Sequence, residues 1–539
     1  MMKMNTKDIL SAAGLLLASL TQAQQRPNVI FIYADDMGKG MMSVYGQKQF
    51  KTPNMDKLVN QGVSFANAYG CHYSAPARAS LLTGYSDCHH KGNWLQTFGP
   101  AYAIDDTAKV APLEKKLDKI GIVLPKGDDY LAQIFQHAGY YTGEIGKLDY
   151  GFVGTRSQTK AHGWDYFYGY LDHGRCHGFY PSFLFENDKI VMIEGNTRAD
   201  AGCMNLANEY DEKGNYRTAR WEMKGKKLYS QDIFEKKITE FIRLHKDKPF
   251  FLYHPSQLPH GPVAVPEIDP QVKTNANLND LEKEYASMII RLDKTIGVIL
   301  NELDRQGLTE NTILVFSSDN GHYLHYKLKN KTSLAANVKT GEKFDNYKNK
   351  FRSEAGGDVF NGNMGMAGLK RSNLEGGVHV PLTFYWKGHL KPAVQQSVVS
   401  NYDFLPTMAD LLDVSVTANK DGISYYPLLI NGQQNIPTNR YVLVDSKEGP
   451  AVIMNNGWKL RFTGGKARTF ELFNLREDPK EMNNLADQYP NKVETMKSIL
   501  KHETTFSECI TGYPTPQDSF NESQVRKDFG LFYKDQLNW

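Results

Sequence analysis

The chain has 539 residues, of which 41% are hydrophobic and 23% are charged, and its formal net charge at pH 7 is +3. This composition is that of a soluble globular protein and excludes a disordered or fibrous chain. Because the net charge is small for this length, it argues against a dedicated nucleic-acid-binding protein, and any anionic ligand requires a local group of basic side chains.

The first 23 residues predict a signal peptide. Two lysines open the chain, a short apolar run covers residues 9–20, and Ala23 gives a cleavage site with a small last residue. The run is too short to span a bilayer comfortably, and no later segment is long and apolar enough to do so. A buried N-terminal helix is the alternative, but Pro27 breaks such a helix. We therefore expect a secreted protein with no integral membrane segment in the mature chain.

Short apolar segments predict strands that are buried on both faces, and helical patterns lie between them. The strand segments, in chain order, are residues 28–34 (NVIFIYA), 249–253 (PFFLY), 312–317 (TILVFS) and 381–385 (PLTFY). The two clearest helical patterns are residues 128–138 and 281–303. Strands that alternate with helices in this way predict an α/β fold.

The pattern changes after about Pro437. Four short strand-like segments follow, and Asn455-Asn456-Gly457 between two of them is a hairpin turn signal. The segments are residues 441–444, 451–454, 459–462 and 470–475, with a helix expected at 491–502. We interpret this part as a small antiparallel sheet that packs with a helix.

Acidic and amide side chains follow the two clearest strands. Asp35 and Asp36 come directly after the first, and Asp319 and Asn320 follow residues 312–317. In open α/β sheets ligands bind outside the carboxyl ends of the strands, so these four side chains are expected to meet there. Three clustered carboxylates require a cation, and hard oxygen ligands suit Ca²⁺ or Mg²⁺ better than Zn²⁺. Either pair alone could be an ordinary loop start.

The segment from Cys71 to Tyr85 (CHYSAPARASLLTGY) combines a hydroxyl with a helix start. Pro76 can open a helix at its first position and Gly84 can end it. Ser74 then lies just before the helix N-terminus, where an anion is favoured, and Arg78 lies one turn above it. This arrangement indicates a nucleophile at an anion site, although a serine that caps a structural helix is an equal alternative.

These residues resemble the signature of the type I sulfatases, C/S-x-P-S/A-R-x-x-x-L-T-G, which stands here as Ser74-x-Pro76-Ala77-Arg78-x-x-x-Leu82-Thr83-Gly84. Further motifs of that family recur in its order: Asp35-Asp36, Gly146-Lys147, residues 163–169, Pro259-His260-Gly261-Pro262, Ser318-Asp319-Asn320-Gly321, Lys370 before Glu375-Gly376-Gly377, and residues 470–475. The resemblance covers about Asn28 to Asp487. Any one motif could arise by chance, but the ordered set is specific.

The resemblance implies an alkaline-phosphatase-like α/β fold. Its large mixed, mostly parallel sheet would be flanked by helices, and a smaller antiparallel sheet with a helix would follow. We accordingly expect a signal peptide at residues 1–23, a sulfatase catalytic domain at 24–436 and a C-terminal subdomain at 437–539.

The chemistry that the resemblance implies begins with oxidation of Ser74 to Cα-formylglycine, whose hydrate is a geminal diol. One hydroxyl attacks sulfur and the other later expels sulfate, which splits one difficult step into two. Calcium, in preference to magnesium, would act as Lewis acid on Asp35, Asp36, Asp319 and Asn320. Sulfate charge would be neutralised by Arg78, Lys147 and Lys370, and His260 would protonate the leaving oxygen. The alternative for Lys147 and Lys370 is a solvated lysine on the surface, and the alternative for His260 is a loop residue without a catalytic role.

One position departs from the family pattern. Asp149 stands where the family often has a histidine that helps release sulfate, and His173, His177 and His322 are the candidates to replace it, with none assigned. The serine form of the signature implies a bacterial protein of the periplasm, and a maturation enzyme of the radical type that acts on Ser74.

The substrate implied by the resemblance is a sulfated carbohydrate. The segment from Tyr170 to Asn187 is rich in aromatic residues and histidine, which suit contacts with sugars, so we expect His173, Arg175 and His177 to lie near the sugar. An aromatic loop packed on the core is an equal alternative. The rival functions are a phosphatase or phosphodiesterase of the same superfamily, and a non-catalytic glycan-binding homologue.

Overall fold

The computed structural model describes residues 26–88, 106–112, 114–115, 128–147, 155–172, 175–198, 210–220, 222–326, 337–343, 350–417, 419–430, 437, 439–446, 448–463 and 469–503. The predicted signal peptide (residues 1–23), Asp149 and His173 lie outside these ranges. Within them, no helix is both long and apolar enough to cross a membrane.

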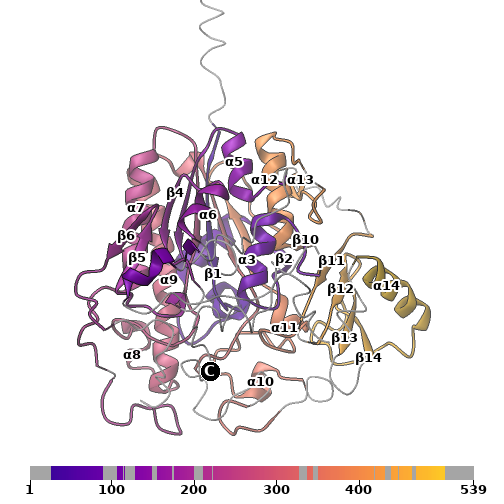
Figure 1. Cartoon of the computed structure of the whole chain (residues 1–539). Helices are drawn as coiled ribbons and strands as arrows, with labels where there is room; N and C mark the ends of the chain where they lie inside the picture. Colours follow the sequence, from indigo (N-terminus) through magenta and orange to yellow (C-terminus); the bar gives the residue numbers. More distant parts are fainter. Residues whose placement is uncertain are drawn as a thin grey trace, which may run out of the picture.

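A large sheet of ten strands forms the centre of the molecule, in the order β10-β2-β9-β8-β1-β7-β3-β4-β5-β6 (Figure 1). Strand β1 (Asn28–Ala34) is parallel to β8 (Thr312–Ser318) on one side and to β7 (Phe250–Pro255) on the other. Strand β3 (Tyr141–Gly146) lies parallel beside β7. These four adjacent strands point their carboxyl ends in one direction, so their following loops meet at one edge.

The remaining strands make the sheet mixed. Strand β9 (Leu382–Tyr385), whose position the sequence predicted, is antiparallel to both β8 and β2. The other strands are β2 (Val63–Tyr69), β10 (Ala393–Ser400), β4 (Tyr166–Gly169), β5 (Phe183–Glu186) and β6 (Lys189–Met192). The predicted α/β fold with a mixed, mostly parallel sheet is confirmed.

Helices cover both faces of the large sheet, which explains why β1 is apolar after Asn28. Ile30 and Ile32 pack in one core with α2 (Pro53–Gln61), α7 (Ser230–His245) and α9 (Asp280–Arg305). The alternate residues Val29, Phe31 and Tyr33 pack in a second core with α3 (Ser74–Thr83), α5 (Leu131–His137) and α12 (Phe404–Leu412). Shorter helices are α6 (Arg156–Ala161), α8 (Pro270–Lys273), α10 (Ser353–Gly356), α11 (Glu375–Val378) and α13 (Tyr426–Ile430).

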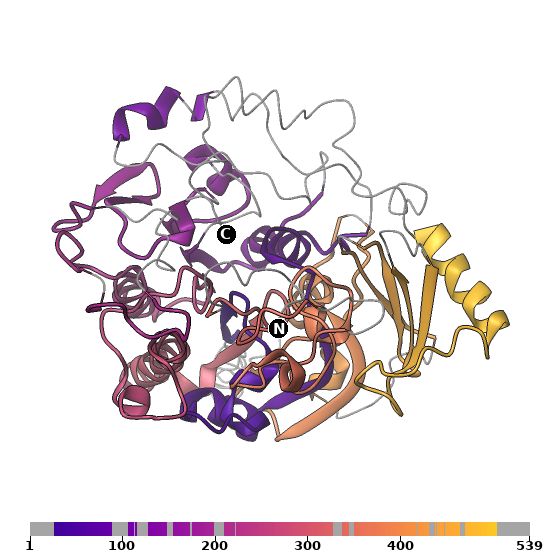
Figure 2. The ribbon, with the colours of Figure 1, turned by 90° about the horizontal axis from the view of Figure 1, so that it is seen from below.

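The C-terminal part forms a separate antiparallel sheet in the order β11-β12-β13-β14. Its strands are β11 (Tyr441–Val444), β12 (Ala451–Met454), β13 (Trp458–Thr463) and β14 (Thr469–Asn474). Helix α14 (Pro490–Glu503) packs on its outer face through an apolar cluster that includes Leu460 and Leu500. The small sheet therefore lies between α14 and the large domain (Figure 2).

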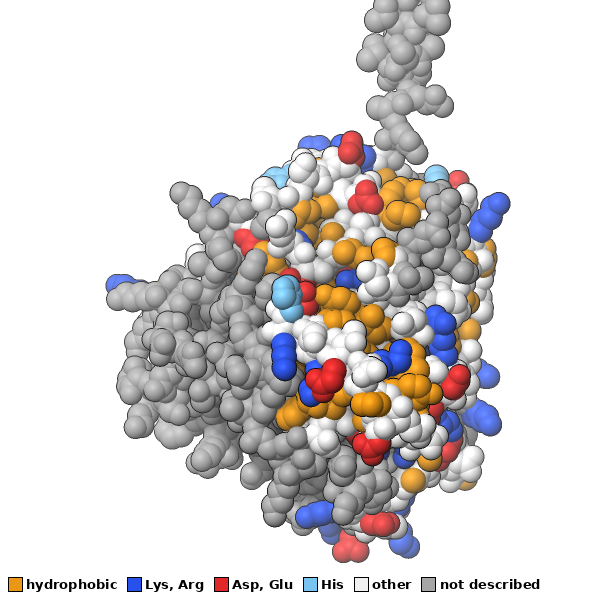
Figure 3. All heavy atoms as spheres, turned by 90° about the vertical axis from the view of Figure 1, so that its right-hand side faces the viewer, with side chains coloured by type: hydrophobic (Ala, Val, Ile, Leu, Met, Phe, Trp, Pro, Cys, Tyr) orange, Lys and Arg blue, Asp and Glu red, His pale blue; other side chains and the backbone are white. Residues whose placement is uncertain are grey.

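The side of the molecule that carries this small sheet has no uniform charge. In Figure 3 hydrophobic side chains lie in groups among Lys, Arg, Asp and Glu side chains. The opposite, inner face of the small sheet shares a core with the large domain, formed by residues that include Val442, Ile453, Tyr69 and Val378.

Candidate active site

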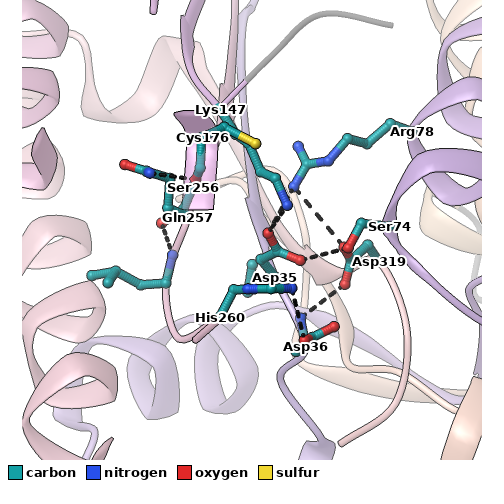
Figure 4. A network of polar contacts seen from close by, with 12 residues as sticks. Asp35, Asp36, Ser74, Arg78, Lys147, Cys176, Ser256, Gln257, His260 and Asp319 are labelled. Carbon is teal, nitrogen blue, oxygen red and sulfur yellow. Dashed lines mark hydrogen bonds and ion pairs between the residues drawn. The ribbon is translucent and has the colours of Figure 1, made fainter. Parts of the chain in front are cut away.

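Loops from the four central parallel strands meet at one edge of the sheet (Figure 4). Asp35 and Asp36 follow β1, Asp319 and Asn320 follow β8, Lys147 follows β3, and the loop after β7 carries His260. All six side chains are buried. The structure brings together the two strand ends that the sequence singled out, and the other two strands add a lysine and a histidine.

Ser74 begins helix α3 and faces the acidic residues. The helix starts at Ser74, two residues earlier than the predicted start at Pro76. Ser74 therefore lies in the first turn of the helix, and the preceding residue, Tyr73, has an extended backbone. Gly84 ends the helix with a φ of 73°, as expected for a left-handed C-terminal residue. The Ser74 hydroxyl donates a hydrogen bond to Asp35 Oδ1 at 2.7 Å.

Arg78 is a fully buried cation beside the same carboxylates. Its Nη2 lies 3.6 Å from Asp35 Oδ2 and 4.0 Å from Asp319 Oδ2. Among the described residues, none of its three guanidinium nitrogens has a hydrogen-bond partner. Because leaving buried donors unpaired is costly, and because the guanidinium fork matches oxyanions, this side chain is arranged to receive an anion.

Three buried carboxylates form an oxygen cluster beside these cations. Asp35, Asp36 and Asp319 each offer one carboxylate oxygen within 4.8 Å of the others. Burial and the charges of Asp35 and Asp36 raise the pKa of Asp319 well above its usual value. In the part of the chain that the structure describes, Asp319 Oδ2 and Asn320 Oδ1 are buried without hydrogen-bond partners. An all-oxygen donor set with two unsatisfied atoms fits a hard divalent cation.

Two lysines and His260 surround the carboxylates. The Lys147 ammonium contacts Asp35, and Lys370 Nζ lies 2.7 Å from Asp36 Oδ1 and 3.2 Å from His260 Nε2. Both lysines are buried, which excludes the alternative of solvated surface side chains. His260 Nδ1 lies 2.6 Å from the Gly261 carbonyl oxygen, so Nδ1 carries the proton and Nε2 faces the site.

These contacts explain the electrostatics of the site. Burial opposes ionisation of Asp35, but the charges of Lys147, Arg78 and Lys370 lower its pKa well below the usual value. Burial and the charge of Lys370 lower the pKa of His260, so its ring is neutral while no anion is bound. Basic and acidic groups thus neutralise one another in the absence of ligands.

His325 is a site residue that the sequence reasoning missed. Its Nε2 lies 2.5 Å from Asp36 Oδ2, and its ring centroid lies 4.6 Å from that of His260. Asp36, His260 and His325 form a second group of potential metal ligands, but the Lys370 ammonium already contacts two of its members. The only signal was its position on the loop after β8. The histidine singled out there, His322, lies 3.6 Å from Asp358 instead.

The residues expected near a sugar take different positions. His177 Nε2 lies 3.2 Å from Lys147 Nζ, and its ring stacks on His260 with centroids 4.2 Å apart. Arg175 instead stacks over the Phe183 ring at 3.7 Å and donates to the Phe183 carbonyl oxygen. His177 therefore lies beside Lys147 and His260, whereas the Arg175 guanidinium contacts β5.

Comparisons with known proteins point to one family. A family model described as "Sulfatase" matches residues 27–414, and one described as "N-sulphoglucosamine sulphohydrolase, C-terminal" matches residues 367–506. An N-acetylgalactosamine-6-O-sulfatase of Bacteroides thetaiotaomicron is 27% identical over 90% of this chain and 94% of its own length. An N-acetylgalactosamine-6-sulfatase of Rattus norvegicus is 26% identical over 79% of this chain and 69% of its own.

Solved structures share the fold. One, named for the metabolism of multiple glycosaminoglycans by Bacteroides thetaiotaomicron, has a TM-score of 0.65 and 25% identity, and the match covers 89% of this chain and 99% of that one. The crystal structure of Ps i-CgsB in complex with k-i-k-neocarrahexaose has a TM-score of 0.66 at 22% identity, over 95% of this chain and 99% of that one, which shows likeness of fold.

Proposed function

The chain belongs to the sulfatase family of sulfuric ester hydrolases, and on that premise we propose that it removes 6-O-sulfate from N-acetylgalactosamine in sulfated glycans. The proposal includes a formylglycine made from Ser74 and a bound Ca²⁺. The bacterial and mammalian relatives that are named for this sulfated sugar support the substrate.

The observation that carries the proposal is the buried Arg78 guanidinium, whose nitrogens have no hydrogen-bond partner among the described residues. It lies beside Asp35, to which the Ser74 hydroxyl donates. A nucleophile position next to an unsatisfied donor fork is the arrangement that a tetrahedral oxyanion such as a sulfate group requires.

The absent groups would supply defined chemistry: the hydrated aldehyde at position 74 provides the nucleophilic oxygen, and a divalent ion held by Asp35, Asp36, Asp319 and Asn320 provides Lewis acidity. The chain's own residues do the rest. Asp35 orients the oxygen at position 74. Arg78, Lys147 and Lys370 bind the sulfate oxygens, and His260, which takes up a proton at Nε2 when the sulfate ester is bound, delivers that proton to the leaving oxygen.

His177 is the histidine whose contacts favour the role left open by Asp149. It accepts a hydrogen bond from Lys147 and stacks on His260, so it lies among the groups assigned to the sulfate. His322 contacts Asp358 instead. We therefore assign His177 to the sulfate end of the site in place of the sugar contact expected from the sequence.

The test begins with protein matured by a radical-type enzyme in an anaerobic host and exported to the periplasm. Mass spectrometry of the peptide with Ser74 is expected to show the loss of two hydrogens. The matured protein is then assayed with the 6-sulfate and the 4-sulfate of N-acetylgalactosamine and with the matched 6-phosphate. Release from the 6-sulfate alone supports the proposal.

Other outcomes identify the rival functions. Faster release of phosphate than of sulfate would make the protein a phosphatase or phosphodiesterase. Binding of the sulfated sugar without release, by protein that carries the aldehyde, would make it a glycan-binding homologue. Active protein with an unmodified Ser74 would contradict the assigned nucleophile.

A further inference from the structure

The inner face of the C-terminal sheet carries buried charges that point toward the large domain. On β13, Lys459 and Arg461 are both fully buried, whereas Leu460 between them faces α14. Charged side chains are costly to bury and often contribute little net stability, so a buried ionic network is a candidate for fixing the position of the groups it joins.

The network reaches the segment that contains Lys370, defined here as residues 370–378. Lys459 Nζ lies 2.9 Å from Glu375 Oε1 and 3.0 Å from Glu481 Oε1. Glu481 Oε2 accepts a hydrogen bond from the Glu375 amide at 2.8 Å. Burial would raise the pKa of Glu375, but the charge of Lys459 outweighs it and lowers that pKa to about 2. Glu375 is therefore held as an ion at the start of α11.

A second connection lies two residues earlier in the segment. Asn373 is fully buried; its Oδ1 accepts a hydrogen bond from Arg461 Nε at 2.6 Å, and its Nδ2 donates to the carbonyl oxygens of Gly449 and Phe462. Three hydrogen bonds thus fasten this side chain to the small sheet. Both ends of the connection are buried, so water does not compete for them.

The far side of the segment contacts the active-site loops. The Lys370 amide donates to the His322 carbonyl oxygen at 3.0 Å, and the Gly377 carbonyl oxygen accepts from Gly321, the residue after Asn320. The approach is close: a side-chain carbon on Gly321 would lie 2.1 Å from the Gly376 carbonyl oxygen. The segment is therefore clamped between the small sheet and the loop that bears the β8 oxygen ligands.

From these contacts we propose that Lys459 and Asn373 are positioning residues of the active site: they hold residues 370–378 against the C-terminal sheet so that the Lys370 ammonium stands between Asp36 and His260. The C-terminal subdomain would then contribute to sulfate binding without touching the substrate. This rests on the function proposed above only in that Lys370 binds the sulfate.

The test compares Lys459→Met and Asn373→Ala with Leu500→Ala, which perturbs the same sheet on its α14 face. Activity on N-acetylgalactosamine-6-sulfate is measured well below each melting temperature, per mole of aldehyde. We expect kcat to fall by about 10–100-fold in the first two variants, because displacement of a site residue by about 1 Å costs this much, and to be unchanged in Leu500→Ala.

A double-mutant cycle separates positioning from general damage. In a Lys370→Met background, Lys459→Met is expected to reduce kcat by less than about threefold, because its effect passes through Lys370. An equal loss of kcat with and without Lys370 would overturn the proposal. So would an unchanged kcat when Lys459→Met is made in the protein that retains Lys370. If Lys459→Met does not fold, Asn373→Ala removes no charge and carries the same cycle.

Hydrogen exchange gives a readout that needs no activity. We expect the peptide covering residues 370–378 to exchange faster in Lys459→Met and Asn373→Ala than in wild type, and at the wild-type rate in Leu500→Ala. Unchanged exchange in both would refute the clamp. A wild-type protein that releases no sulfate would refute the proposed function alone, since the exchange result still decides the positioning role.

Discussion

Substitution of Lys370 by methionine is expected to change two properties in opposite directions. The ammonium lies 2.7 Å from Asp36 Oδ1, so it neutralises a carboxylate that we assign to a divalent cation. In the proposed mechanism the same ammonium also binds the sulfate. Lys370→Met keeps most of the length of the side chain and removes its charge and hydrogen-bond donors, which lowers sulfate turnover while it raises affinity for the metal.

The magnitudes follow from elementary electrostatics. At an effective dielectric constant of about 20, unit charges about 4 Å apart attract by roughly 4 kcal/mol. Partial solvation reduces this, so we expect the metal to bind tighter by about 1–3 kcal/mol, or about 5–150-fold. Loss of a charge-assisted hydrogen bond together with that attraction costs the transition state about 3–5 kcal/mol, or about 10²–10⁴-fold in kcat/KM.

The assay pairs calorimetric titration of the chelator-treated protein with Ca²⁺ and steady-state sulfate release. A matched control is Lys237→Met, a partly exposed lysine that pairs with Glu186 on the edge of the sheet away from the site. Weaker Ca²⁺ binding by Lys370→Met would refute the reasoning, because it would show that the ammonium does not compete with the ion. If Lys370→Met turns over sulfate within about threefold of wild type, Lys370 does not bind the sulfate in the transition state.

Three further predictions follow. Ser74→Ala removes the hydroxyl that donates to Asp35 and is expected to abolish turnover while costing only about 0.5–1.5 kcal/mol of stability, as thermal unfolding and activity assays would show. Treatment with a chelator is expected to lower the melting temperature. Ca²⁺ at about 100 times its Kd is then expected to restore about 2.7 kcal/mol of the free energy of unfolding. Equal melting curves with and without Ca²⁺ would contradict the assignment of a metal site. Burial and the charge of Asp87 raise the pKa of Asp445 to about 8. The folded state then holds a proton that the unfolded chain releases near pH 4, so stability is lost as pH rises from about 4 to 8, and Asp445→Asn is expected to raise the melting temperature at pH 8 but not at pH 4.

The central strands could be predicted because they are buried on both faces. β1 has the predicted bounds, and β8 extends the predicted segment by one residue. Strand β3 was missed, because its sequence YTGEIG carries polar residues and glycine that propensity does not favour in a strand. Its neighbours β7 and β4 supply the pairing that sequence patterns do not contain.

The site was predictable to the extent that its residues follow strands in a fixed order. Asp35 and Asp319 lie where two predicted strands end, and parallel neighbours bring such ends together. Lys147 follows β3, which was not predicted, so only the resemblance to the family's motif indicated it. His325 lies on a loop without periodic pattern, and only folding places it on Asp36. For Arg175 the sequence showed only an aromatic segment, and only the fold shows that its guanidinium lies over the Phe183 ring and donates to the Phe183 carbonyl oxygen.

The charge balance of the site implies that cation and anion binding depend on each other. Lys147 pairs with Asp35 and Lys370 pairs with Asp36, so the groups assigned to sulfate contact the groups assigned to the metal. A divalent ion on the carboxylates would weaken these pairs and leave both ammonium groups available to the sulfate. Because linkage is reciprocal, sulfate must then strengthen metal binding by the factor by which the metal strengthens sulfate binding. Such coupling requires both ligand sets to share one buried cluster, and the ends of the central strands, α3 and the segment before α11 together create that cluster.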